Sequence, residues 1–257
     1  MPEGDTIMWA ATRMRPVLEG RAVEVVHTHP RFGMDRWEQR LGGHVVERIE
    51  THGKNLFLVF DNGLVLHSHL RMTGVWDVRP VGGRWRRSPR RAWLVLRAGQ
   101  QEVVQYDGPV LELMTEGRRR SDQRLSQLGP DILAPEFDRD RFLARLRASD
   151  QTRLLGEALL DQRILAGIGN IWKSEGCWEV ALDPWRALST VSDAQALGLV
   201  EAVRPRMLAS GAGGPRSIRA RVYGHTGHPC PRCGTGIVSR GQGEENRTTY
   251  WCPGCQL

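Results

Sequence analysis

The sequence contains very little lysine: of its 36 basic residues only Lys54 and Lys173 are lysines, and the others are arginines. It has no apolar run close to the roughly eighteen residues of a membrane-spanning helix, which excludes an integral membrane protein. The start, Met-Pro-Glu-Gly-Asp, is neither basic nor apolar, so we expect no secretory signal and a cytoplasmic protein. Codon bias explains most of the excess of arginine over lysine. The two positions that keep a lysine in such a chain are therefore of interest.

The charge balance favours an anionic partner. Thirty-six basic residues against 29 acidic ones give a net charge of +7, and the isoelectric point is near 9.7. An excess of this sign is typical of proteins that bind nucleic acid or an acidic membrane surface. A mildly basic protein without such a partner is the alternative. With 257 residues, 40% of them hydrophobic, the chain is long enough for one large domain or two modest ones.

The first half of the chain predicts a β-rich domain. Apolar residues at helical spacing over 7–20 predict a helix that ends at Gly20. Short strand-like runs separated by Gly, Asn and Asp follow, and Asp61-Asn62-Gly63 is a hairpin signal. The expected strands are Ala22–Val26, His44–Glu50, Asn55–Phe60, Gly63–His67, Gly74–Arg79, Ala92–Arg97 and Glu102–Tyr106. Seven strands at this spacing predict a sandwich or barrel with the first helix packed outside. Arg84–Arg91, with five arginines in eight residues, is interpreted as a solvated loop.

The pattern becomes helical after Gly117. Helices are expected at Arg139–Ala148, Arg153–Leu160, Ile171–Val180 and Ser192–Ala209, with a Gly-rich connection at 161–170 and a flexible loop at 211–215. The order is a β-rich half, a helical half and a small tail, which defines an α+β fold class.

Four cysteines near the C-terminus have the spacing of a metal site. Cys230-x-x-Cys233 and Cys252-x-x-Cys255 are separated by eighteen residues, as in zinc sites made of four cysteines. Four thiolates leave no open position on a tetrahedral ion, so we expect one structural Zn²⁺ that supplies much of the folding energy of the tail. The fifth cysteine, Cys177, lies in an apolar helical stretch and is expected to be inert core.

The N-terminus offers a nucleophile. A small second residue, Pro2, allows removal of Met1, which exposes a secondary amine. An α-amino group has a pKa near 8, so part of it is neutral and can attack an aldehyde carbon to give an iminium ion. The adjacent Glu3 can move protons to and from the intermediates. Many proteins begin Met-Pro-Glu without such chemistry, so this feature needs support from other motifs.

Other motifs supply that support. In chain order they are Met-Pro-Glu-Gly at 1–4, Gly-Lys-Asn-Leu at 53–56, His-Leu-Arg-Met-Thr-Gly at 69–74, Leu-Leu-Asp-Gln at 159–162 with Gly-Ile-Gly-Asn at 167–170, Val-Tyr-Gly at 222–224, and Arg-Thr-Thr-Tyr-Trp-Cys-Pro-Gly-Cys-Gln at 247–256. Along essentially its whole length the chain resembles the formamidopyrimidine-DNA glycosylase / endonuclease VIII family. The resemblance implies excision of oxidised bases followed by strand cleavage through β,δ-elimination.

The resemblance also implies an architecture of three domains. These are an N-terminal β-sandwich catalytic domain at 1–118 with a flanking helix, a helix–two-turn–helix DNA-binding domain at 119–228, and a zinc finger at 229–257. The expected partner is damaged DNA in duplex form, with single-stranded DNA left open, and no membrane. The protein is expected to be a monomer.

Matching by motif assigns roles to individual residues. Pro2 resembles the nucleophile and Glu3 the proton donor, while Lys54 resembles the lysine of the catalytic domain that binds backbone phosphate near the lesion. A second group is expected to bind DNA. Its members are Asn170 and Arg247 as phosphate ligands, Met72 as the apolar wedge that fills the gap left by the everted nucleotide, and Arg71 beside it. A residue of a core strand is the alternative interpretation of Met72.

Three departures from the family pattern matter. Thr6 stands where the family commonly has a second carboxylate, with Asp5 or water as substitutes, and Thr73 stands where endonuclease VIII has a tyrosine. Asp107–Thr115 lacks the Arg–Phe pair of formamidopyrimidine-type enzymes. Together with the two terminal motifs this favours the endonuclease VIII branch and oxidised pyrimidines. The alternatives are specificity for formamidopyrimidine and 8-oxoguanine, and a catalytically inactive zinc-finger protein that binds lesions or abasic sites.

Overall fold

The computed structural model describes residues 2–215 and 217–257, which form two compact units. The first unit consists of Thr6–Ser126 with Pro2, and the second of Gln127–Leu257 with Glu3–Asp5. Each unit has a hydrophobic core of its own.

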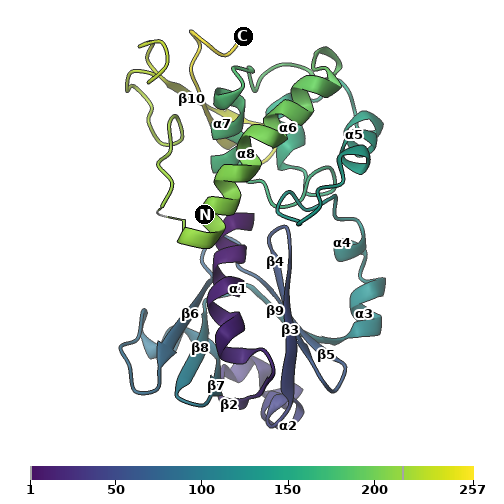
Figure 1. Cartoon of the computed structure of the whole chain (residues 1–257), viewed down its shortest axis with the longest axis vertical. Helices are drawn as coiled ribbons and strands as arrows, with labels where there is room; N and C mark the ends of the chain where they lie inside the picture. The colour runs from purple at the N-terminus through teal and green to yellow at the C-terminus, as the bar shows by residue number, and fades with distance from the viewer. Residues whose placement is uncertain (1, 216) are drawn as a thin grey trace. The chain divides into compact units, whose positions relative to one another are not determined.

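The first unit is built on two antiparallel sheets (Figure 1). The five-stranded sheet has the order β1 (Arg21–Ala22), β3 (Val45–His52), β4 (Asn55–Phe60), β5 (Leu64–His69) and β9 (Val110–Thr115). The four-stranded sheet has the order β2 (Glu24–Thr28), β7 (Ala92–Ala98), β8 (Gln101–Tyr106) and β6 (Val75–Pro80). Short helical segments lie between the strands or follow the last one: η1 (Pro30–Asp35), α2 (Trp37–Leu41), η2 (Pro89–Arg91), α3 (Glu116–Ser121) and α4 (Gln123–Ser126).

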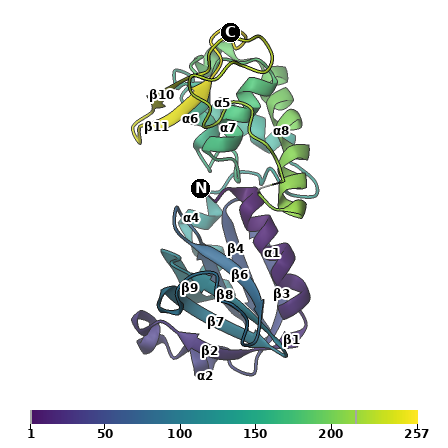
Figure 2. The same ribbon diagram turned by 90° about the vertical axis from the view of Figure 1, so that its left-hand side faces the viewer.

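Helix α1 (Gly4–Leu18) lies along one open side between the two sheets, as Figures 1 and 2 show. Its apolar residues recur at helical spacing, so they form one face, and that face is buried in the same core as the inner residues of both sheets. The helix therefore closes the sandwich.

Strand β4 explains how the sandwich carries a second apolar layer. All six of its residues are buried. Leu56 and Leu58 point into the main core, whereas Phe57 and Val59 belong to a smaller cluster with Met114 on the other face of the same sheet. Because neighbouring side chains of a strand alternate between faces, a continuous apolar run requires cover on both faces.

The second unit is helical with a small hairpin. Its helices are α5 (Arg139–Ala148), α6 (Leu155–Leu160), α7 (Asn170–Glu179), η3 (Leu188–Thr190) and α8 (Asp193–Gly213), and its strands are β10 (Val238–Gln242) and β11 (Arg247–Trp251). Ser192 begins α8 with a capping box to Gln195. Figure 2 shows the β10–β11 hairpin beside α6 and α7, and the contacts between α7 and β11 agree with that view.

The α+β fold class and the predicted order of sandwich, helical domain and cysteine tail are confirmed. Strand β9 was not predicted, and the expected flexible loop at 211–215 is wrong at its start because α8 continues to Gly213. The first helix begins at Gly4 rather than at residue 7, and α6 begins at Leu155 rather than Arg153. The proposed boundaries of the three domains stay a prediction.

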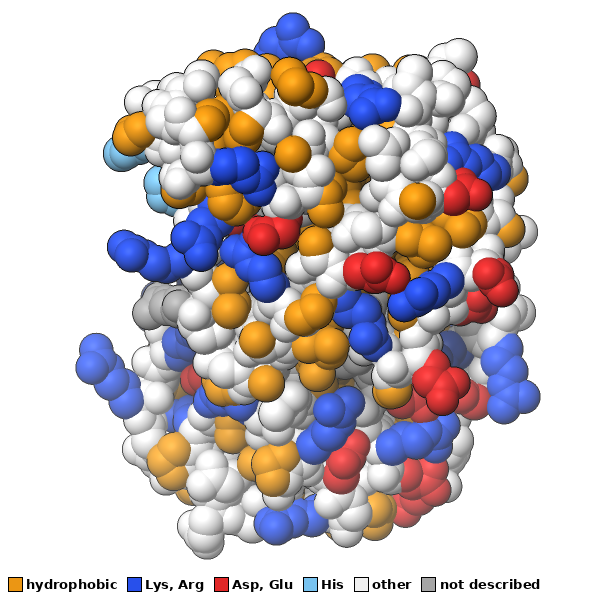
Figure 3. Space-filling model, turned by 45° about the horizontal axis from the view of Figure 1, so that its top comes forward, with side chains coloured by type: hydrophobic (Ala, Val, Ile, Leu, Met, Phe, Trp, Pro, Cys, Tyr) orange, Lys and Arg blue, Asp and Glu red, His pale blue; other side chains and the backbone are white. Residues whose placement is uncertain are grey.

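The surface carries mixed charge. On the face in Figure 3, Asp and Glu side chains lie among Lys and Arg chiefly on the right, whereas the left carries mainly Lys and Arg. Many arginines are engaged in ion pairs with neighbouring carboxylates. Within the described residues, no helix has the length and apolar character needed to cross a bilayer.

Candidate functional site

The carboxylate of Glu3 is bound by the N-terminus of α7. It accepts hydrogen bonds from the backbone N–H groups of Gly169 (2.9 Å), Ile171 (2.7 Å) and Trp172 (3.3 Å), and only 1% of the residue is exposed. The first N–H groups of a helix have no partner within the helix, and the helix dipole favours a negative charge at that end. The anionic form of Glu3 is therefore stabilised in a buried place.

Two glycines allow this approach. A Cβ added to Gly169 would lie 2.3 Å from Cδ of Glu3, so any side chain there would displace the carboxylate. The N–H of Gly4 donates to the carbonyl of Gly167 at 2.9 Å, and Gly167 has a φ of +104°, which favours glycine. The motifs Met-Pro-Glu-Gly and Gly-Ile-Gly-Asn therefore contact each other directly.

The connection between α6 and α7 is held by Gln162. Its Nε2 donates to the carbonyls of Leu160 (3.0 Å) and Ile168 (2.9 Å), and its Oε1 accepts from the N–H of Gly167 (3.0 Å). One side chain therefore spans the whole two-turn segment and fixes the entry into α7.

Asp5 is also buried in the second unit. It is 5% exposed, and Oγ of Ser210 on α8 donates to its Oδ2 at 2.5 Å. Asp5 directly precedes Thr6, which stands where the family commonly has a second carboxylate. The carboxylate of Asp5 is directed at a hydroxyl of α8.

The two predicted phosphate ligands of this unit are linked. Asn170, the first residue of α7, donates from Nδ2 to the carbonyl of Thr248 at 2.6 Å. Thr248 directly follows Arg247, which begins β11. The bond therefore holds the start of α7 and the start of β11 together, and with them Asn170 and Arg247.

Lys173 is one turn further along α7 and has no exposed surface. Its Nζ donates to Oγ1 of Thr249 at 2.6 Å and to Oε1 of Gln242 at 3.4 Å, so it connects α7 to both strands of the hairpin. Burial lowers the pKa of Lys173 from 10.5 to about 8. Lys173 is one of only two lysines in the chain, and its buried position could not be predicted from the sequence pattern.

The four predicted metal ligands converge. The sulfur atoms of Cys230, Cys233, Cys252 and Cys255 all lie within 4.8 Å of one another, with 3.8 Å between Cys230 and Cys255 and 3.4 Å between Cys233 and Cys252. Four Zn–S bonds of about 2.3 Å in tetrahedral arrangement place sulfurs about 3.8 Å apart. The donor set and its geometry therefore fit one tetrahedral metal ion, and these residues could hold it.

Donors around the cysteines also suit a negatively charged metal–thiolate centre. Nε1 of Trp178 lies 3.3 Å from Sγ of Cys230, and the backbone N–H of Arg232 lies 3.4 Å from the same sulfur. Such N–H groups stabilise the charge of ligated sulfur. Cys177 is fully buried and packs in the core of the second unit, as expected.

In the first unit, Lys54 lies in the turn between β3 and β4 rather than on a strand. His52 pairs with Asn55 across a two-residue turn, and Gly53 has a φ of +58°, a conformation that suits such a turn. The strand register places Asn55, the first residue of β4, opposite His69, the last residue of β5. Lys54 therefore lies next to the C-terminal end of β5.

His69 begins the motif at 69–74, but no role was predicted for it from the sequence. Burial and the nearby charges of Arg71 and Lys54 lower its pKa from 6.5 to about 4. Its Nδ1 accepts the backbone N–H of Arg71 at 3.1 Å, which requires that nitrogen to be unprotonated. His69 therefore remains neutral at physiological pH beside two cations.

Met72 is presented by a tight turn after β5. Arg71 has a φ of +48°, the N–H of Gly74 donates to the carbonyl of Leu70 at 2.8 Å, and 60% of Met72 is exposed. A large apolar side chain exposed at the tip of a turn is not a core strand residue, which was the alternative interpretation. Pro2 is half-buried at the start of the first unit.

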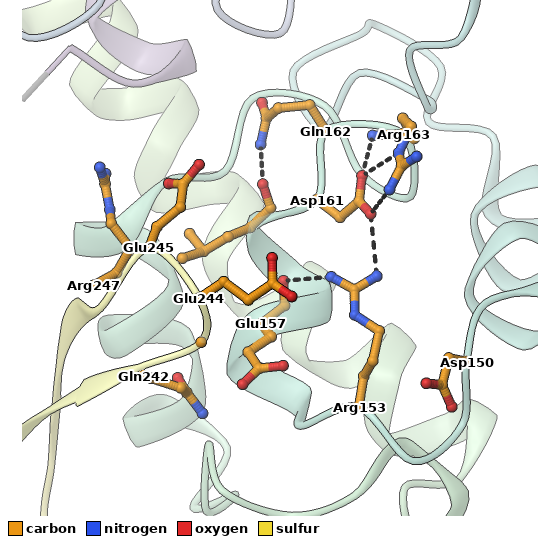
Figure 4. Close-up of a pocket in the computed structure, with 12 residues that line it drawn as sticks. Asp150, Arg153, Glu157, Asp161, Gln162, Arg163, Gln242, Glu244, Glu245 and Arg247 are labelled. Atoms are coloured by element: carbon orange, nitrogen blue, oxygen red, sulfur yellow. Dashed lines mark hydrogen bonds and ion pairs between the residues drawn. The ribbon is translucent and has the colours of Figure 1, made fainter.

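A pocket of about 660 Å³ lies in the second unit between α6, the segment that follows it and the tip of the hairpin (Figure 4). Arg247 is on its wall, but most of the lining is acidic or already paired. Asp161 accepts bonds from both Arg153 and Arg163, and chiefly the bond from Arg163 lowers the pKa of Asp161 to about 2. Pro2, Glu3 and Lys54 do not line this pocket, so it is separate from the predicted catalytic residues.

Comparison with known proteins assigns the family. The model of the formamidopyrimidine-DNA glycosylase N-terminal domain matches residues 1–124, and that of the formamidopyrimidine-DNA glycosylase H2TH domain matches 128–219. The chain therefore belongs to the formamidopyrimidine-DNA glycosylase family, and the resemblance inferred from its motifs is confirmed.

Relatives named endonuclease 8 or Nei2 are similar to this chain over 94% or more of their own length. A probable endonuclease 8 2 of Streptomyces coelicolor is 40% identical, covering 100% of this chain and 94% of the relative. The DNA-(apurinic or apyrimidinic site) lyase Nei2 of Mycolicibacterium smegmatis is 35% identical, covering 100% and 99%. Endonuclease 8 of Escherichia coli is 31% identical, covering 100% of both chains.

Solved structures agree on the fold. A complex of the Lactococcus lactis Fpg with abasic-site DNA has a TM-score of 0.84 at 23% identity and covers 99% of both chains. A complex of the same protein with DNA containing an oxidised pyrimidine has a TM-score of 0.83 at 23% identity and covers both chains fully.

The cradle of Glu3, which consists of the three backbone amides that donate to its carboxylate, can be tested with Gly169→Ala. The added methyl group occupies the position of the carboxylate, so we expect base excision to fall by about 100-fold, the lower end of what a positioned proton-transfer group contributes. Single-turnover excision of a damaged base measures the effect. Gly198→Ala on α8 is the matched control, because nothing lies within 4 Å of its added Cβ. Excision by Gly169→Ala within twofold of wild type would contradict the role of the cradle.

Lys173 predicts a pH dependence of stability. Its charged form is penalised by burial, so the penalty is fully present below pH 8 and disappears as pH rises towards 10.5. We expect the free energy of unfolding to gain about 3 kcal/mol over this interval from Lys173, and Lys173→Met to lack that gain. Urea denaturation of both proteins from pH 7 to 10 measures the difference between their free energies of unfolding. The contributions of other titrating groups are common to both proteins and cancel in this difference. Parallel curves for the two proteins would show that Lys173 is not buried as a cation.

Proposed function

We propose that this chain removes oxidised pyrimidine bases from DNA and then cuts the strand by β,δ-elimination, with the amine of Pro2 as the nucleophile. At the level of the family, it is a DNA repair enzyme, a DNA glycosylase with lyase activity at apurinic or apyrimidinic sites. The observation that carries the proposal is the binding of the Glu3 carboxylate by three amides at the start of α7. Pro2 is joined directly to this fixed residue, with Cα atoms about 3.8 Å apart across the peptide bond.

In the proposed reaction, removal of Met1 leaves Pro2 with a secondary amine. Its nitrogen attacks C1′ of the damaged nucleotide, the bond from C1′ to the base breaks, and the base leaves with a proton. Protonation of the ring oxygen O4′ then breaks the C1′–O4′ bond and leaves an iminium ion between C1′ and the proline nitrogen. The iminium ion acidifies C2′, and loss of a proton from C2′ breaks the C3′–O bond. A second elimination breaks the C5′–O bond. Glu3 is proposed to exchange protons with the sugar oxygen and these intermediates.

The remaining predicted residues are proposed to hold the DNA. Lys54, Asn170 and Arg247 bind backbone phosphates around the everted nucleotide, and Met72 fills the gap that it leaves, with Arg71 beside it. The link between Asn170 and Thr248 supports a joint role for Asn170 and Arg247. We propose damaged DNA as the partner of a monomeric, cytoplasmic protein.

The preference for pyrimidines has two supports. The relatives named endonuclease 8 are 31–40% identical to this chain, whereas the similar structures of Fpg and MutM proteins are 22–24% identical. The chain also lacks the Arg–Phe pair at 107–115. Specificity for 8-oxoguanine or formamidopyrimidine is the competing possibility within the family.

We also propose that the four clustered cysteines bind one structural Zn²⁺. Their spacing in sequence, the distances between their sulfurs and the nearby N–H donors support this choice. All four positions of a tetrahedral ion are then filled by protein, so the ion stabilises the hairpin and takes no part in the chemistry.

Borohydride trapping tests the nucleophile and the lesion preference together. Reduction of the iminium ion should give a covalent adduct on duplex DNA with an abasic site. An adduct should also form on a duplex with an oxidised pyrimidine, and less on one with 8-oxoguanine. A variant with one residue added before Pro2 should give none, because an amide nitrogen cannot form the iminium ion.

The other outcomes are distinct. Trapping on 8-oxoguanine in preference to pyrimidines would assign the other branch of specificity. Binding to abasic-site DNA without any adduct would indicate a protein that binds lesions without catalysis. An adduct that persists in the extended variant would place the nucleophile at another residue, with Lys54 as the first candidate. Mass spectrometry of the active protein must show that Met1 is absent.

Arg247→Ala tests the phosphate contact. Loss of one phosphate contact should weaken DNA binding and reduce the slope of log K against log salt concentration by about one. Arg139→Ala is the control, because this exposed arginine on α5 forms an ion pair with Glu201. Titration of abasic-site duplex at several salt concentrations measures both variants. An unchanged slope and affinity for Arg247→Ala would remove this residue from the DNA-binding surface.

A further inference from the structure

Two arginines of the segment Arg84–Arg91 converge on one carboxylate. Nη1 of Arg87 lies 2.5 Å from Oδ2 of Asp107, and Nε and Nη2 of Arg91 lie 2.9 and 2.8 Å from its Oδ1 and Oδ2. These charge-assisted bonds, together with partial burial of Asp107, form a fixed cluster at the end of β8. The interpretation of the whole segment as a solvated loop is therefore wrong for Arg87, whose side chain is 27% exposed, whereas the ion-paired side chain of Arg91 stays 53% exposed.

The cluster is bonded to the turn that carries Met72. The same Nη1 of Arg87 donates to the carbonyl of Thr73 at 2.7 Å, and Oγ1 of Thr73 donates to the carbonyl of Asp107 at 3.1 Å. Thr73, the residue next to Met72, is thus held through both its backbone and its side chain. Asp107 adopts a φ of +47°, uncommon for a residue with a side chain, which this set of bonds stabilises.

The other end of the turn is fixed as well. Leu70 is buried, its carbonyl accepts the N–H of Gly74, and the N–H of Arg71 donates to His69. A turn anchored on both sides of an exposed Met72 loses little conformational freedom when that side chain enters an apolar environment. A flexible turn would lose more, so the anchors favour insertion.

Arg87 differs from its neighbours in this respect. Within the described part of the chain, Arg84 and Arg90 are exposed and form no ion pair, whereas 27% of the Arg87 side chain is exposed and its Nη1 bonds to protein. Arg87 is therefore suited to holding protein rather than to binding phosphate.

We infer that Arg87 is a positioning residue that holds Met72 for insertion into the base stack of duplex DNA, acting through Thr73 and Asp107. The inference rests on the proposed role of Met72 as the wedge. A wedge acts only where a stack has to be opened and filled, so the contribution of Arg87 is confined to duplex substrates.

The experiment compares cleavage at an abasic site in a duplex with cleavage of the same strand alone, in single turnover. Arg87→Ala should slow duplex cleavage by about tenfold, as expected for loss of hydrogen bonds from a charged group, and change single-strand cleavage by less than about twofold. Arg87→Lys keeps one charged donor and should recover part of the loss. Arg90→Ala, from the same segment, should leave the ratio of the two rates unchanged.

Met72→Ala separates this inference from the proposed function. If Met72→Ala leaves the ratio unchanged, Met72 is not the wedge and the proposed function loses that element. If Met72→Ala lowers the ratio and Arg87→Ala does not, the positioning role of Arg87 is wrong. The double variant should be no slower on duplex than Met72→Ala alone, because Arg87 acts through Met72. Additive losses, equal losses on both substrates, or an equal effect of Arg90→Ala would each overturn the inference.

Discussion

The contact between Glu3 and the N-terminus of α7 is the interaction on which the candidate site depends. It joins residues 166 positions apart in the chain through a backbone amide and a carboxylate. A buried carboxylate without such donors would be strongly unfavourable, and the first amides of a helix without an acceptor would also be unsatisfied. Each group therefore offsets the free-energy cost of burying the other. The absence of a side chain at Gly169 is what makes the approach possible.

Helix α7 extends this principle along its length. Four of its polar residues are buried, and each bonds outside the helix or to its own backbone: Asn170 to β11, Lys173 to both strands of the hairpin, Ser174 to the carbonyl of Asn170, and Glu175 to the amides of residues 221–223. Trp178 then reaches Cys230. One ten-residue helix therefore fixes the Glu3 carboxylate, the start of β11 and the cysteine cluster, so disturbing α7 affects all three together.

The sequence predicted the elements better than the contacts between them. Alternating apolar residues and turn signals located β3 to β8 individually but merged β1 and β2, which lie in different sheets, into one strand. The paired Cys-x-x-Cys motifs located the cluster of four cysteines. Strand β9 was missed because Val110–Thr115 is short and contains Glu112, and its stability comes from pairing with β5, more than forty residues earlier. The helix at Ile171–Val180 was predicted, but the buried polar contacts of α7 were not, since periodicity cannot show that a polar residue has a buried partner. Lys173 and His69 owe their altered pKa values to such surroundings.

Residues at or beside the departures from the family pattern form hydrogen bonds in this structure. Beside Thr6, the carboxylate of Asp5 bonds to Ser210, so its proximity in sequence does not make it a free second acid. At Thr73, a hydroxyl takes the place of a tyrosine ring, and it bonds to the carbonyl of Asp107 within the segment that lacks the Arg–Phe pair. Arg87 and Arg91 then neutralise the carboxylate that this segment carries. A small side chain at 73 is compatible with an anchored turn because its bonds, rather than its bulk, fix the position of Met72. The short side chain of Thr73 fixes the turn through its bond to Asp107, and Met72 is the exposed apolar group of the turn.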